Sequence, residues 1–198
     1  MTEYVFDIEA DGIDATKIHC MIANGEEVNR FFFKNLTSDD VLIGHNIIRY
    51  DIPTIERLLN IKIKAQLIDT LALSWYLFPT INRHGLEQWG ERLNIEKPTI
   101  TDWENLTREE YIHRCKEDVK INTKLWGLQK SLLIKIYDGD YQPLVRYLSF
   151  KMKMAMLQEA SKWKLDVDKA NILLNELELK NEQAINELSK VMPKVDQI

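Results

Sequence analysis

Residues 5–12 read VFDIEADG, an apolar strand pattern that contains two carboxylates. Successive side chains of a β-strand point to opposite faces, so Asp7 and Glu9 share one face and lie about 7 Å apart. Phe6 and Ile8 then face the other side of the strand. Two like charges on a buried face are unfavourable unless something positive lies between them. The stretch therefore predicts a β-strand that needs a positively charged partner on its acidic face.

The composition is that of an ordinary globular protein. The chain has 198 residues, 45% hydrophobic and 29% charged, enough for one domain or for one domain with a helical extension. Its net charge of −5 argues against a broad basic surface for nucleic acid, although it allows contact with phosphate through metal ions. Cys20 and Cys115 are predicted to be free thiols. The absence of a leader-like start and of a membrane-length apolar run predicts a cytoplasmic protein without a membrane partner.

Short apolar or alternating runs indicate where the chain forms strands. Turn-forming pairs separate the first three runs, which predicts a meander, and the later runs alternate with segments of helical spacing. This order predicts an α/β fold. The predicted strands are residues 3–8, 17–23, 28–34, 41–46 and 66–68.

The helical segments have recognisable ends. Apolar spacing predicts a helix over 51–59, and Asp69 is placed to cap the next helix. A short amphipathic helix is expected over 84–93. Thr107 and Glu110 have the spacing of a capping box, which predicts the start of a long helix that ends near residue 136.

The C-terminal part also has a helical pattern. It runs from residue 144 to 191 and is interrupted near 163–168, where an aspartate can cap a second helix. This pattern predicts a helical hairpin. Its apolar stripes require a partner surface.

Two further acidic motifs follow the first along the chain. The sequence NIIRYD at 46–51 leads from the fourth predicted strand into a helix, and HRCKED at 113–118 lies within the long predicted helix. Taken alone, Asp51 is an ordinary helix N-cap and Asp118 an ordinary surface acid. Asp118 is beside the apolar positions of its helix, however, which favours an inward orientation. The order of the three acidic motifs indicates a common site.

This ordered set resembles the DEDD superfamily of 3′→5′ exonucleases, whose motifs are D-x-E, N-x(2–3)-Tyr/Phe-Asp, and either Tyr-x(3)-Asp or His-x(4)-Asp. The resemblance covers residues 3 to about 125. It implies a ribonuclease H-like fold, a five-stranded mixed sheet flanked by helices. It also implies phosphodiester hydrolysis with two divalent cations, Mg²⁺ or Mn²⁺, which would supply the positive partner of the first strand. The implied metal ligands and catalytic acids are Asp7, Glu9, Asp51 and Asp118.

The resemblance leaves two candidates for the residue that activates water. His113, five residues before Asp118, corresponds to the histidine of one branch of the superfamily and is favoured as the general base. The other branch has a tyrosine four residues before the aspartate, where this chain has Arg114. Tyr111, two helical turns before Asp118, is the alternative. The substrate contacts expected from the motifs are Asn46, Tyr50, Arg49 and Ile8.

The C-terminal part resembles the segment that joins the proofreading domain to the thumb in phage-type family A DNA polymerases. We therefore expect a DEDD exonuclease domain over 1–137 and a helical extension over 144–198 that resembles the start of a polymerase thumb. The implied function is release of nucleoside 5′-monophosphates from the 3′ end of single-stranded DNA during proofreading, in the cytoplasm of a bacterium or a phage-infected cell. The polymerase module would be in the same chain or a separate partner. The alternatives are a DEDD exoribonuclease or oligonuclease, and a non-catalytic scaffold in a replication complex.

Overall fold

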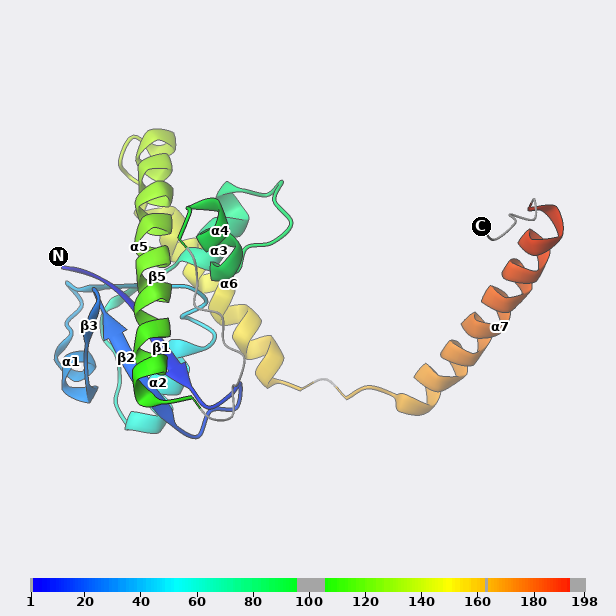
Figure 1. The fold of residues 1–198 in the computed structure, drawn as a ribbon, viewed down its shortest axis with the longest axis horizontal. Helices are drawn as coiled ribbons and strands as arrows, with labels where there is room; N and C mark the ends of the chain where they lie inside the picture. Colours follow the sequence, from blue (N-terminus) through cyan, green and yellow to red (C-terminus); the bar gives the residue numbers. More distant parts are fainter. Residues whose placement is uncertain (1, 96–105, 163, 193–198) are drawn as a thin grey trace. The chain divides into compact units, whose positions relative to one another are not determined.

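The structure is a computed structural model that describes residues 2–95, 106–162 and 164–192 (Figure 1). The chain divides into two units, Met1–Leu157 and Gln158–Ile198. The first unit contains the sheet and all the predicted site residues. The two units are described separately below.

The first unit is built on a five-stranded sheet with the spatial order β3-β2-β1-β4-β5. β1 is the central strand: it pairs with β2 in antiparallel and with β4 in parallel orientation. β3 pairs antiparallel with β2, and β5 pairs parallel with β4. The predicted five-stranded mixed sheet is therefore confirmed. The strands are β1 (Glu3–Ala10), β2 (Ile18–Ala23), β3 (Glu26–Glu27), β4 (Val41–Gly44) and β5 (Gln66–Asp69).

Helices cover both faces of this sheet (Figure 1). On one face, Val5 of β1 packs in a core with residues of α5 (Arg108–Tyr137). On the other face, Phe6 and Ile8 pack in a second core with residues of α1 (Arg30–Asn35) and α2 (Asp51–Leu59). The alternation predicted for β1 is thus confirmed, and it turns Asp7 and Glu9 toward α5. The remaining helices of this region are α3 (Thr70–Leu77), α4 (Leu86–Arg92) and α6 (Gln142–Ala160).

The predicted strand at 28–34 is wrong. The third strand is limited to Glu26–Glu27, and residues 30–35 form helix α1. Asn29 caps this helix, because its side chain accepts a hydrogen bond from the backbone N–H of Phe31. Helical geometry lets Phe33 fill the second core while Phe31 is left exposed. The cap and the burial of one ring therefore outweigh the strand preference of three consecutive phenylalanines.

The long helix α5 has the predicted ends. Thr107 and Glu110 form the reciprocal hydrogen bonds of a capping box at its start. Asp138 adopts the left-handed conformation at its end, with φ of 48°. The capping box fixes where the helix begins, and the buried side chains Cys115 and Val119 mark the face of α5 that packs on the sheet.

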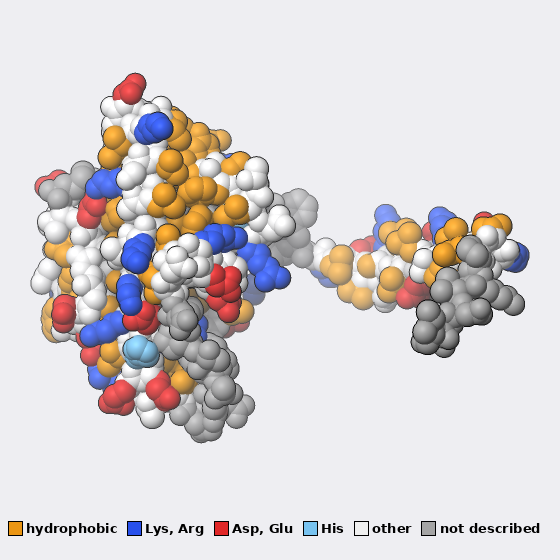
Figure 2. All heavy atoms as spheres, turned by 45° about the horizontal axis from the view of Figure 1, so that its top comes forward, with side chains coloured by type: hydrophobic (Ala, Val, Ile, Leu, Met, Phe, Trp, Pro, Cys, Tyr) orange, Lys and Arg blue, Asp and Glu red, His pale blue; other side chains and the backbone are white. Residues whose placement is uncertain are grey.

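The second unit contains helix α7 (Val167–Val191), which Asp166 caps by accepting a hydrogen bond from the backbone N–H of Lys169. Its apolar side chains are exposed within this unit and are visible as orange atoms along the helix in Figure 2. The predicted hairpin packing and the boundary between 137 and 144 remain predictions; residues 163 and 193–198 lie outside the described part. Among the described residues, no helix has both the length and the apolar character to cross a membrane.

Candidate metal centre

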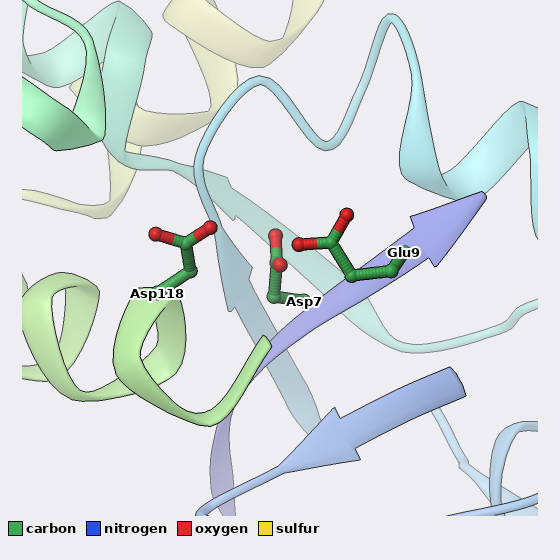
Figure 3. A group of neighbouring side chains, drawn as sticks. All are labelled: Asp7, Glu9 and Asp118. Carbon is green, nitrogen blue, oxygen red and sulfur yellow. The ribbon is translucent and has the colours of Figure 1, made fainter. Parts of the chain in front are cut away.

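Three carboxylates from two distant segments of the first unit lie close together. Asp7 and Glu9 project from β1, and Asp118 projects from α5 toward them (Figure 3). Each residue offers one oxygen, and these oxygens lie within 4.8 Å of one another. Carboxylate oxygens at this spacing are the hard ligands that Mg²⁺ and Mn²⁺ prefer. The three side chains therefore fit a divalent cation.

Asp51, the fourth predicted acid, lies at the start of α2 and is buried. Its carboxylate accepts a hydrogen bond from the backbone N–H of Ile8, which ties it to β1. The close-set group named above consists of Asp7, Glu9 and Asp118, and Asp51 is outside it. The charge of Asp51 nevertheless acts on Asp7. Asp51 is thus placed to add a fourth negative charge beside the group.

The electrostatics of the site disfavour its own charges. Burial raises the pKa of Asp7 well above its ordinary value, and the neighbouring charges of Asp51, Asp118 and Glu9 raise it further. Burial also raises the pKa of Asp51 to about 8, with the charges of Asp69 and Glu9 adding to the effect. Carboxylates in such surroundings gain from a positive neighbour, so the site is arranged to favour a bound cation.

A buried aspartate, Asp69, positions the segment before Asp51 in addition to its predicted role as a helix cap. Asp69 caps α3 through the N–H groups of Leu71 and Ala72. The same carboxylate accepts hydrogen bonds from the N–H groups of Asn46, at 3.1 Å, and Ile48, at 3.3 Å. It therefore fixes the loop that leads from β4 to α2. The only sequence signal for this role was the position of Asp69 at the end of a predicted strand.

The same loop depends on a glycine at the end of β4. A Cβ atom at Gly44 would lie 1.9 Å from Cγ2 of Ile47, so any larger residue would force the loop to move. Two residues later, Asn46 has a φ of 66°, a left-handed conformation that asparagine tolerates. These two residues let the chain turn sharply and bring Asp51 back toward β1.

The predicted substrate residues occupy different environments. The side-chain oxygen Oδ1 of Asn46 is buried and has no hydrogen-bond partner among the described residues. The hydroxyl of Tyr50 donates a hydrogen bond to the carbonyl of Gly12 at 2.6 Å, which links α2 to the loop after β1. Arg49 is half-buried beside it. The side chain of Ile8 is buried in the second core and its backbone N–H donates to Asp51, and its contact with the substrate stays a prediction.

The two candidates for the general base, His113 and Tyr111, both lie on α5. His113 is exposed on α5, and its five-residue separation from Asp118 is about 140° around the helix. Tyr111 is half-buried and stacks on His19 with ring centres 4.0 Å apart. Arg114, in contrast, contacts the group directly: its Nε donates a hydrogen bond to Oε1 of Glu9 at 2.7 Å. From the sequence, Arg114 was recognisable as a departure from the tyrosine pattern but not as a partner of Glu9.

The mixed sheet and its flanking helices define the ribonuclease H-like α/β fold. Among solved structures, NrnC of Brucella melitensis bound to pGG matches with a TM-score of 0.60 and 15% identity, over 81% of this chain and 88% of that one. NrnC with bound Mg²⁺ matches with a TM-score of 0.58 and 16% identity, over the same shares of the two chains. At this level of identity the likeness concerns the fold.

Similarity in sequence is more local. No model of a known protein family matches the chain. The "DNA polymerase III PolC-type" of Mycoplasma genitalium is 38% identical over 82 residues, which are 39% of this chain and 5% of that polymerase. The chain is therefore similar to a small part of the polymerase.

Proposed function

We propose that the protein is a metal-dependent 3′→5′ exonuclease of the DEDD type that hydrolyses phosphodiester bonds at the 3′ end of single-stranded DNA and releases nucleoside 5′-monophosphates. The observation that carries this proposal is the convergence of Asp7, Glu9 and Asp118 within 4.8 Å, from segments more than 100 residues apart. Such a partly buried group of acids costs stability, and a bound cation would offset that cost. A catalytic role explains why the chain carries this group of acids.

In the proposed site, the carboxylates of Asp7, Glu9 and Asp118 would hold one cation, and Asp51 would hold a second one. A divalent cation supplies a Lewis acid for the phosphoryl oxygens and lowers the pKa of water. The chain fixes the ligands: β1 holds Asp7 and Glu9 in register, and the N–H of Ile8 orients Asp51. Arg49 and Tyr50, next to Asp51 in the sequence, are proposed to contact the substrate phosphates.

The proposed biological role is proofreading, together with a polymerase module in the same chain or in a separate one. The local similarity to a PolC-type DNA polymerase supports this role. The resemblance of the C-terminal part to the start of a family A polymerase thumb remains a proposal. The sequence similarity is to a different polymerase, of the PolC type, and spans 5% of it. The second candidate function is degradation of short oligonucleotides, which the structure of NrnC bound to pGG favours.

The test is digestion of a 5′-labelled single strand in Mg²⁺ or Mn²⁺, with DNA, RNA and the dinucleotide pGG as separate substrates. We expect a ladder of products that shortens from the 3′ end, and we expect a chelator to stop it. A strand whose last linkage is a phosphorothioate is the control and should be shortened more slowly. Faster cleavage of pGG than of long DNA would favour the oligonuclease. If none of the substrates is shortened in a metal-dependent way, the proposal is contradicted.

His113→Ala is expected to lower the cleavage rate less than about threefold, whereas loss of a general base costs about 100-fold or more. The reason is that His113 is exposed on α5 and is turned about 140° from Asp118. Tyr111→Phe, which removes the hydroxyl and keeps the ring stacked on His19, is the matched variant. The measurement is the single-turnover rate at saturating Mg²⁺. A fall of about 100-fold for either variant would identify that residue as the base.

A further inference from the structure

Arg114 forms an ion pair inside the candidate metal centre. Its Nε lies 2.7 Å from Oε1 of Glu9, and the two side chains are only 18% and 14% exposed. Surface ion pairs are weakened by water and salt, but a pair that is this well covered is screened much less. The contact therefore places a full positive charge against one of the proposed metal ligands.

The position of Arg114 on α5 explains the contact. It precedes Asp118 by four residues, so the two side chains project from the same side of the helix, one turn apart. Asp118 and Glu9 both belong to the close-set group of carboxylates. Arg114 consequently reaches the same carboxylate that a cation shared with Asp118 would use.

A guanidinium and a divalent cation on the same carboxylate repel each other, because both are positive and the site excludes most water. We propose that Arg114 is a built-in counter-ion that holds Glu9 in the cation-free protein, competes with the divalent cation for it, and leaves Glu9 when the cation binds. Arg114 thus sets the cation affinity of the site below that of the carboxylates alone. This inference rests on the proposed function only in that the carboxylates bind a divalent cation.

The first test is calorimetric titration of Mn²⁺ into chelator-stripped protein. Arg114→Gln should bind Mn²⁺ at least about tenfold more tightly than the wild type, and Arg114→Lys, which keeps the charge, should fall between them. Arg108→Gln is the matched control: Arg108 lies on the same helix and pairs with Glu27 at an exposed position, so the variant changes the net charge equally without touching the site. It should bind Mn²⁺ within twofold of the wild type.

If Arg114→Gln binds Mn²⁺ as tightly as the wild type or more weakly, the inference is overturned. It is also overturned if Arg108→Gln tightens Mn²⁺ binding as much as Arg114→Gln does. If the wild type binds Mn²⁺ no better than Asp7→Asn does, the proposed function fails as well. If Arg114→Gln binds Mn²⁺ as the wild type does while the wild type shortens DNA, only the inference fails.

A second measurement needs no substitution in case Arg114→Gln does not fold. The Nε–H signal of Arg114 in the wild type is followed by NMR during titration with Mg²⁺. We expect it to exchange slowly with water in the cation-free protein and at least about tenfold faster at saturation, because the hydrogen bond to Glu9 is lost. An unchanged signal at saturating Mg²⁺ would overturn the inference.

Discussion

Asp7→Asn is expected to lower the rate of metal-dependent cleavage by at least about 1000-fold, equivalent to about 4 kcal/mol of lost transition-state stabilisation. Asp7 is in the middle of the acidic group, and its pKa responds to the charges of Asp51, Asp118 and Glu9. Asparagine has nearly the same size but no negative charge, so the packing is retained and the cation loses a central ligand. The measurement is the single-turnover rate on 5′-labelled single-stranded DNA in Mg²⁺.

The control for Asp7→Asn is Asp39→Asn, which removes the same charge from an exposed turn. This variant should retain the wild-type rate within about twofold, since surface substitutions are usually neutral. Circular dichroism establishes that both variants are folded. If Asp7→Asn keeps more than a tenth of the wild-type rate, Asp7 is not a ligand of the catalytic cation.

Much of the fold could be predicted because its signals are local. The alternation in VFDIEADG identifies the two faces of β1, and the caps at Asp69 and Thr107 locate the starts of two helices. The helix α1 could not be predicted in the same way. Three consecutive phenylalanines have no period, and the decisive signal was the cap at Asn29, which also suits a turn.

The prediction of the site depends on topology. β1 and β4 are parallel, so the end of β1 and the loop after β4 lie at the same edge of the sheet, which brings Asp51 near Asp7. The pair between Arg114 and Glu9 spans 105 residues. It depends on the rotation of α5 and on side-chain direction, which no spacing in the sequence encodes. For the same reason, the exposed position of His113 followed only from the structure.

Without a cation, the stability of the protein is expected to fall as the pH rises from about 4 to about 8. Asp51 has a pKa of about 8 in the folded chain, raised by burial from the ordinary value of 3.8. Between these values the folded state binds more protons than the unfolded state, so each rise in pH favours unfolding. The stability that the neutral Asp51 carboxyl contributes is fully present below about pH 4 and is lost as the pH rises through 8. Urea unfolding in the presence of a chelator measures it.

Asp51→Asn should therefore stabilise the cation-free protein at pH 8 by at least about 1 kcal/mol, which raises Tm by about 2–4 °C in a chain of this size. The amide keeps an oxygen that can accept the N–H of Ile8, so the main change is the loss of a buried charge. At pH 4 the difference should disappear, because the wild-type carboxyl is then neutral in the folded protein.

Saturating Mg²⁺ at pH 8 should reverse the order of stability of the two proteins. The cation stabilises the ionised carboxylate of Asp51 in the wild type, whereas Asp51→Asn offers the cation one fewer negatively charged ligand. Asp39→Asn, with its exposed charge, should follow the wild type at every pH. A cation-free Asp51→Asn protein that is less stable than the wild type at pH 8 would mean that Asp51 is held by hydrogen bonds strong enough to offset its burial. In that case Asp51 would be a structural residue of the α2 start and not a strained ligand that a cation relieves.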